Sequence, residues 1–76
     1  MQPLHLACWY GQAEMVDLLI EKGADMNAVN SDGNTALHFA AFNGQVKVIK
    51  QLINYEADPS IPNHSGETYL QGINEG

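Results

Sequence analysis

The sequence has no arginine and only three lysines, against nine acidic residues, which gives a net charge of −6. A surface that binds nucleic acid or an anionic membrane needs clustered lysine and arginine side chains, because these neutralise phosphate groups. The composition therefore argues against both kinds of partner. A complementary partner is expected to be another protein with a basic surface of Lys or Arg.

Cysteine and long apolar runs are also scarce. Cys8 is the single cysteine, which excludes an internal disulfide framework and fits a reducing compartment. The sequence has no apolar run of about 18 residues, the length that suggests a membrane-spanning helix. It also has no basic segment followed by an apolar stretch near Met1, the pattern of a secretory signal. We therefore expect one small intracellular domain, cytoplasmic or nuclear.

An internal repeat dominates what the sequence does contain. The segment Leu4-His5-Leu6-Ala7 returns 33 residues later as Leu37-His38-Phe39-Ala40. Similarity at a fixed period of this size predicts a stack of units, each of which packs on its neighbours. The units are expected at about residues 1–30 and 31–63, with a partial third at 64–76. Other identical pairs at this spacing are Gly11 and Gly44, Gln12 and Gln45, Leu19 and Leu52, Ala24 and Ala57, Asp25 and Asp58, and Thr35 and Thr68.

Each period predicts two short helices, a turn between them and a longer loop, which makes the fold class all-α. The first helix begins at Pro3, a residue suited to a first helical turn, and Gly11 interrupts it. The second helix begins near Ala13, and its apolar residues form one stripe at helical spacing. The loop contains Asp32-Gly33, a strong turn signal, and Thr35 can cap the next helix. The stripe residues are Met15, Val16, Leu19 and Ile20, and one unit later Val48, Ile49, Leu52 and Ile53.

The repeating unit resembles the ankyrin repeat. The resemblance rests on Thr35-Ala36-Leu37-His38-Phe39-Ala40-Ala41, on Asp32-Gly33-Asn34-Thr35 and on residues 18–27, and it covers residues 2 to about 70. It implies an all-α solenoid of stacked antiparallel helix pairs, with loops and β-turns that project at roughly a right angle. Such stacks usually need at least three units. We therefore expect either a fragment of a longer protein or self-association through exposed repeat ends.

The sequence departs from the family pattern at several positions. Gln2 stands at the threonine position, Ala36 and Tyr69 at the proline position, and Glu56 at the glycine position. A left-handed backbone at Glu56 would cost roughly 1–2 kcal/mol. Residues 71–76 depart most, because Gln71 takes the histidine position and glycines follow. The third unit is therefore expected to be either a degenerate end or a truncated one.

The resemblance also implies where a partner protein would make contact. In this family the variable ends of the short helices line a concave groove together with the loop tips. The corresponding residues here would place an aromatic strip beside acidic tips, and aromatic residues are enriched among binding hot spots. The alternative is that the aromatic residues only cover the seam between helices. The expected contacts are Trp9, Tyr10, Ser31, Asp32, Asn34, Phe42, Asn43, His64, Ser65 and Glu67.

No pattern in the sequence predicts catalysis, a cofactor or a metal site. His5 and His38 are one repeat apart, much farther than the ligands of structural zinc sites, and the resemblance gives both rings a structural role. Cys8 is expected to be buried and inert. The expected function is a protein–protein interaction module without enzymatic activity. The alternative is an architectural or regulatory appendage of a larger multidomain enzyme or carrier protein, with no separate partner of its own.

Two further features each have two interpretations. Glu14 and Asp17 align with Lys47 and Lys50 one unit later, so the long helices carry either ion pairs between units or two solvated faces. Asn27 has the spacing seen in ankyrin asparagines that become hydroxylated. It is otherwise a plain turn residue whose side chain bonds nearby backbone.

Overall fold

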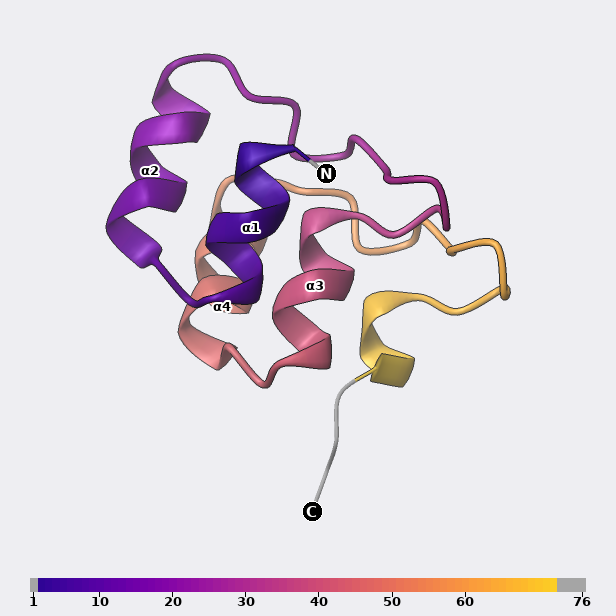
Figure 1. Cartoon of the computed structure of the whole chain (residues 1–76). Helices are drawn as coiled ribbons and strands as arrows, with labels where there is room; N and C mark the ends of the chain where they lie inside the picture. Colours follow the sequence, from indigo (N-terminus) through magenta and orange to yellow (C-terminus); the bar gives the residue numbers. More distant parts are fainter. Residues whose placement is uncertain (1, 73–76) are drawn as a thin grey trace.

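The computed structural model describes residues 2–72, which form two stacked helix pairs and a short 3-10 helix (Figure 1). No strand occurs within this part of the chain. The helix positions agree with the sequence prediction to within a few residues, and the helices confirm the all-α fold class. The helices are α1 (Pro3–Trp9), α2 (Ala13–Glu21), α3 (Ala36–Phe42), α4 (Val46–Asn54) and the 3-10 helix η1 (Tyr69–Gly72).

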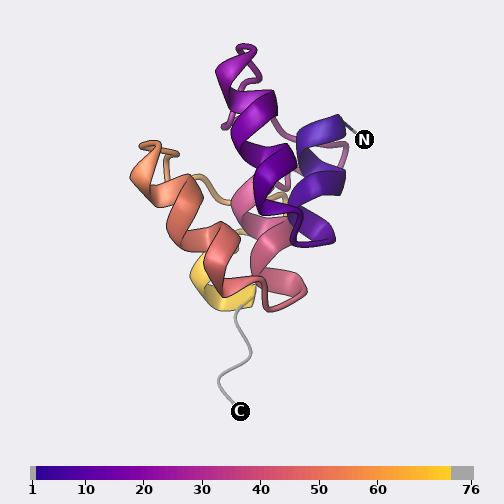
Figure 2. The ribbon, with the colours of Figure 1, turned by 90° about the vertical axis from the view of Figure 1, so that its left-hand side faces the viewer.

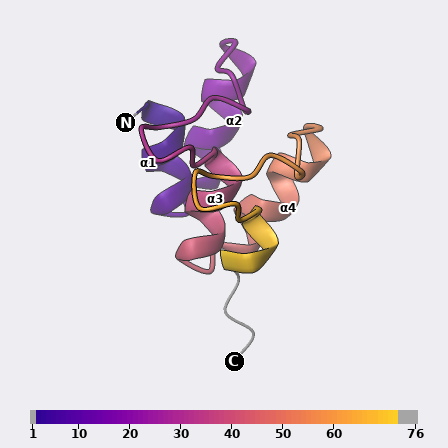
Figure 3. The same ribbon diagram turned by 90° about the vertical axis from the view of Figure 1, so that its right-hand side faces the viewer.

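The helices lie in two layers. The short helices α1 and α3 pack side by side and η1 continues this inner layer, whereas α2 and α4 form the outer layer (Figure 2). The two long loops leave the helices on the same side and run next to each other (Figure 3). Elements one period apart are therefore spatial neighbours, as the repeat predicts. Among the helices of residues 2–72, none is long and apolar enough to cross a membrane.

The core lies between the two layers, and both units contribute residues to it. Leu4 and Leu37 are almost fully buried, as are Val16, Val48 and Leu52. Alanines at positions 7, 36, 40 and 41 are also buried, and their small side chains allow the helices to approach closely. Cys8 lies among them, and burial raises the pKa of its thiol to about 12. The thiol therefore stays protonated at neutral pH, which agrees with the inert role expected for it.

His38 joins the start of α3 to the loop of the next unit. The Thr35 N–H donates to His38 Nδ1 over 3.0 Å, and the Thr35 hydroxyl oxygen lies 2.9 Å from the same atom. With Nδ1 accepting, Nε2 carries the proton and donates to the Glu67 carbonyl oxygen over 2.7 Å. The side chain of Thr35 also caps the helix, so the residues form a capping box. The structural role expected for this histidine is confirmed.

His5 makes only half of the equivalent contacts. Its Nε2 lies 3.0 Å from the Ala28 carbonyl oxygen, but its buried Nδ1 has no hydrogen-bond partner. The difference arises at Gln2, which stands where the second unit has Thr35 and which offers no side-chain cap. The backbone at Gln2, with φ −77° and ψ 156°, already resembles that of Thr35, with φ −89° and ψ 175°.

We expect the substitution Gln2→Thr to raise the free energy of unfolding by about 1 kcal/mol, because a threonine hydroxyl would both cap α1 and reach His5 Nδ1. Urea denaturation followed by circular dichroism measures the change. The reverse exchange in the second unit, Thr35→Gln, is the matched control and should lower the stability. An unchanged midpoint for Gln2→Thr would mean that the unpartnered nitrogen of His5 carries no cost.

Hydrogen bonds fasten the two long loops to each other. The backbone N–H of His64 donates to the carbonyl oxygen of Asp32 over 2.9 Å. Nearer the helices, the backbone N–H of Asp58 donates to Asn27 Oδ1, also over 2.9 Å. The side chain of Asn27 therefore has a structural role in connecting the units, and its hydroxylation stays a prediction. These bonds hold the tips of neighbouring loops in fixed positions.

The departures from the repeat pattern have visible consequences. Glu56 adopts a left-handed backbone with φ 69°, as expected for a residue at a glycine position. The third unit begins with η1, a 3-10 turn that packs on α3. In place of a histidine, Gln71 accepts a hydrogen bond from the Thr68 N–H through Oε1 over 2.8 Å. Residues 73–76 of the expected third unit lie outside the described residues.

Candidate functional site

Three aromatic residues form an edge of the inner layer, at the ends of α1 and α3. Tyr10 is 65% exposed, Phe42 is 41% exposed, and Trp9 is half-buried. We call Trp9, Tyr10 and Phe42 the aromatic edge. Trp9 and Phe42 both pack edge-to-face on Phe39, with ring centroids 6.2 and 6.3 Å apart. Because Phe39 is only 6% exposed, one buried ring supports two partly exposed ones.

The aromatic edge connects to the loop of the following unit through His38. The rings of Phe42 and His38 have centroids 6.1 Å apart, and His38 in turn donates to the backbone of Glu67. The interpretation that the aromatic residues cover the seam between helices is thus correct for the buried side of Trp9. It does not account for Tyr10 and Phe42, whose rings remain open to solvent.

Asn43 holds the aromatic edge in place. Its Nδ2 donates to the Trp9 carbonyl oxygen over 2.7 Å, and Gln45 Nε2 donates to the same oxygen over 3.2 Å. Two amides of the second unit therefore satisfy the last carbonyl of α1, which lacks a helical partner. Asn43 was expected to contact a partner protein, and in the structure its amide makes this internal bond. Gln45 was not expected to contribute to this site. The repeat did hint at its importance, because Gln12 is the identical residue one period earlier.

The tips of the two long loops lie next to each other (Figure 3). Ser31, Asp32, His64, Ser65 and Glu67 are all exposed, and we call these five residues the loop tips. The hydrogen bond between His64 and Asp32 brings the tips of both units together. Asn34 differs from them, because it is only 9% exposed and its Oδ1 accepts a hydrogen bond from Asn63 Nδ2 over 3.0 Å. We therefore leave Asn34 out of the candidate surface.

The loops carry negative charge and no lysine. Asp25, Glu56 and Asp58 are exposed in addition to the acidic residues of the tips. The hydroxyl and the backbone N–H of Ser60 both donate to Asp58, and they lower the pKa of its carboxyl group. This group therefore stays ionised well below neutral pH. The loop side of the molecule has a negative potential that favours an approaching basic group.

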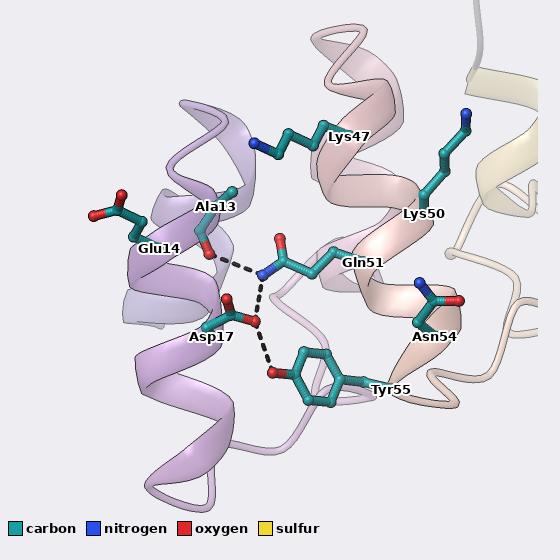
Figure 4. Close-up of a pocket in the computed structure, with 8 residues that line it drawn as sticks. All are labelled: Ala13, Glu14, Asp17, Lys47, Lys50, Gln51, Asn54 and Tyr55. Carbon is teal, nitrogen blue, oxygen red and sulfur yellow. Dashed lines mark hydrogen bonds between the residues drawn. The ribbon is translucent and has the colours of Figure 1, made fainter.

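A second candidate surface lies between the two long helices, where a pocket of about 570 Å³ opens between α2 and α4 (Figure 4). Asp17 Oδ1 accepts hydrogen bonds from the Tyr55 hydroxyl over 2.7 Å and from Gln51 Nε2 over 2.6 Å. These two bonds lower the pKa of Asp17. An ion pair between Asp17 and Lys50 was one of the two interpretations of these positions. Asp17 instead accepts hydrogen bonds, because the neutral side chains reach the carboxylate directly. The sequence did not predict the roles of Gln51 and Tyr55. The equivalent residues of the first unit are Leu18 and Lys22, so the repeat gives no signal at these positions.

The described residues offer no metal centre. Within residues 2–72, no group of three or more His, Cys, Asp or Glu side chains is gathered closely enough to hold a metal ion. The three histidines are accounted for separately, two in the inner layer and His64 at a loop tip.

Comparison with known proteins gives one family match and several related proteins. A family model described as ankyrin repeats (3 copies) matches residues 1–71. Over 35 residues the chain is 46% identical to the ARF GTPase-activating protein Git of Drosophila melanogaster and 51% identical to Ankyrin repeat and SOCS box protein 11 of Danio rerio. It is 54% identical over 35 residues to the Probable E3 ubiquitin-protein ligase XBOS33 of Oryza sativa subsp. japonica. Each match covers 46% of this chain but only 5%, 12% and 7% of the respective relative.

Proposed function

The chain belongs to the ankyrin-repeat family, and we propose that it binds a partner protein through the aromatic edge and the loop tips. Ankyrin repeats generally act as protein–protein interaction modules. The observation that carries the proposal is that partly exposed aromatic rings pack on the buried ring of Phe39. Tyr10 and Phe42 present apolar area to solvent, and Phe39 supports the rings of Phe42 and Trp9 from behind. The amide of Asn43 holds the backbone carbonyl of Trp9. Rings fixed in advance lose little conformational entropy on binding.

Charge indicates what the partner presents. Five exposed acidic residues lie in the loops between residues 25 and 67, and all three lysines lie outside those loops. A partner with Lys or Arg next to an apolar anchor would place its charges on the loop tips and its anchor on the aromatic edge. Encounter with such a partner would be faster at low salt, since opposite charges steer association.

The single tryptophan of the chain makes this proposal measurable. We expect a synthetic pentapeptide with one leucine between two Lys-Arg pairs to change the fluorescence of Trp9, and a peptide with glutamates in place of the basic residues not to. The substitution Phe42→Ala, which removes an exposed ring, should weaken binding of the basic peptide by at least about 1 kcal/mol, which raises the Kd roughly fivefold. Trp9→Ala should have a similar effect, measured by calorimetry because it removes the fluorophore.

The control for these variants is Leu18→Ala, which removes an exposed apolar side chain from α2, outside the aromatic edge and the loop tips. It should leave the affinity for the basic peptide unchanged. Circular dichroism must show that each variant keeps its helices. Equal affinity of the Phe42→Ala variant and the original chain would remove the aromatic edge from the proposed binding surface.

A second candidate function is that of an architectural segment within a larger protein. The chain spans at most 12% of the relatives it matches. In addition, the outward side of the first unit exposes apolar side chains, because Met15 is 44% exposed whereas its equivalent Val48 is 1% exposed. Such a face would dock on another part of the same polypeptide or on a second copy. A solution mass equal to one chain at high concentration would argue against the second copy.

A further inference from the structure

The pocket between α2 and α4 contains a polar atom that the fold leaves unsatisfied. The amide nitrogen of Gln51 donates to the Ala13 carbonyl oxygen over 2.8 Å and to Asp17 Oδ1 over 2.6 Å. Its other amide atom, Oε1, is covered from solvent and accepts no hydrogen bond from the described residues. A buried acceptor without a donor is costly, so an N–H group that reaches Oε1 once the Gln51 side chain shifts toward the pocket would be stabilised there.

Two lysines border the same pocket and are free to bind an anion. Lys47 and Lys50 line it from α4, both are exposed, and neither has an ion-pair partner within 4.0 Å among residues 2–72. This is notable in a chain with three lysines and nine acidic residues.

The acidic residues on the opposite wall offset this charge only in part. Asp17 Oδ1 already accepts hydrogen bonds from Tyr55 and Gln51. Glu14 projects away from α4, whereas Lys47 reaches across toward α2 (Figure 4). Asp17 stays ionised, and Lys47 helps to lower its pKa. The two exposed ammonium groups nevertheless border the pocket mouth, and the unsatisfied acceptor belongs to the same pocket.

We infer that this pocket binds an acidic segment of a second partner protein. A backbone N–H of that segment would donate to Gln51 Oε1, and the carboxylate of an Asp or Glu would bind Lys47 and Lys50. A peptide supplies both groups within one or two residues, whereas chloride or sulfate supplies no donor. The pocket belongs to the outer layer and the aromatic edge to the inner layer. The stack thus has separate places for an acidic and a basic partner and connects the two.

Nuclear magnetic resonance of the ¹⁵N-labelled chain tests this inference. The probe is the capped peptide Gly-Glu-Asp-Glu-Gly, and the reporters are the side-chain NH₂ of Gln51 and the backbone amides of α4. Both sets of signals should shift in a saturable way. Lys47→Gln and Lys50→Gln should each raise the Kd by roughly three- to fivefold, the size expected of one exposed ion pair. Lys22→Gln, which removes the same charge outside the pocket, should raise it by less than about twofold.

Two results would overturn the inference. One is equal binding of the uncharged peptide Gly-Gln-Asn-Gln-Gly, and the other is a loss of affinity in Lys22→Gln as large as that in Lys47→Gln, since either shows that no specific charge contact forms. The basic peptide of the preceding section keeps the two proposals separate. Its affinity should not fall in Lys47→Gln, so failure of the outer pocket leaves the aromatic edge untouched, and the converse also holds.

Discussion

Replacing the buried ring of the aromatic cluster by the substitution Phe39→Ala is expected to lower the free energy of unfolding by about 3–5 kcal/mol. Phe39 packs on His5, Trp9 and Phe42, with ring centroids 5.0, 6.2 and 6.3 Å away. Removing it leaves a cavity between α1 and α3. A core of this size supplies only about 3–5 kcal/mol in total, so the variant should be largely unfolded at 25 °C by circular dichroism.

The repeat provides the matched control for this experiment. Leu6 stands one period before Phe39 but is 45% exposed, so Leu6→Ala should cost less than about 1 kcal/mol. A milder variant, Phe39→Leu, keeps most of the volume and should lose no more than about 1.5 kcal/mol, which leaves enough folded protein to measure. Equal losses in Leu6→Ala and Phe39→Ala would contradict the assignment of Phe39 to the junction between units.

The substitution Gly33→Ala should be the second most damaging change, with a cost of about 2–4 kcal/mol. Gly33 has φ +79°, which an L side chain adopts only with strain. A Cβ at this position would also lie 2.9 Å from the backbone nitrogen of His64, which cannot move without breaking its bond to Asp32. Backbone strain and overpacking therefore add. Urea denaturation measures the total.

Gly66 separates these two contributions. It has the same φ of +79°, but a Cβ there would meet nothing within 4 Å. Gly66→Ala should therefore show the strain alone, about 1–2 kcal/mol. The difference between the two variants is the cost of separating the loops. If both lost the same stability, the contact between Gly33 and His64 would have no energetic weight.

Most of the fold follows from the sequence because equivalent residues meet equivalent neighbours in a repeat. The apolar stripe around Val16 and Val48 predicted the long helices, and Gly11 and Gly44 predicted the turns that precede them. The ring of His38 was correctly expected to be structural. Glu56 does adopt the left-handed backbone that the sequence analysis considered for it, because its equivalent in the first unit is Gly23. In each case a residue of one unit indicated the structure at the equivalent position of the other unit.

The candidate site was less predictable, because side-chain amides choose partners that depend on the neighbouring unit. Asn34 and Asn43 were expected to contact a partner, but each amide bonds across the junction between units. A local sequence pattern does not indicate which partner either amide bonds. The same holds for the network of Asp17, Gln51 and Tyr55, whose members have no counterparts one period away. The partner contacts of Trp9, Tyr10, Phe42 and the loop tips remain predictions.

The burial of Cys8 has a consequence for how the stack can be monitored. Its thiol is inaccessible and fully protonated in the packed state, so a maleimide or disulfide reagent can react only while the helices around α1 are transiently separated. Because the chain has no other thiol, the labelling rate counts such opening events without any engineered reporter. A ligand that selects the closed form should slow that rate in proportion to its occupancy.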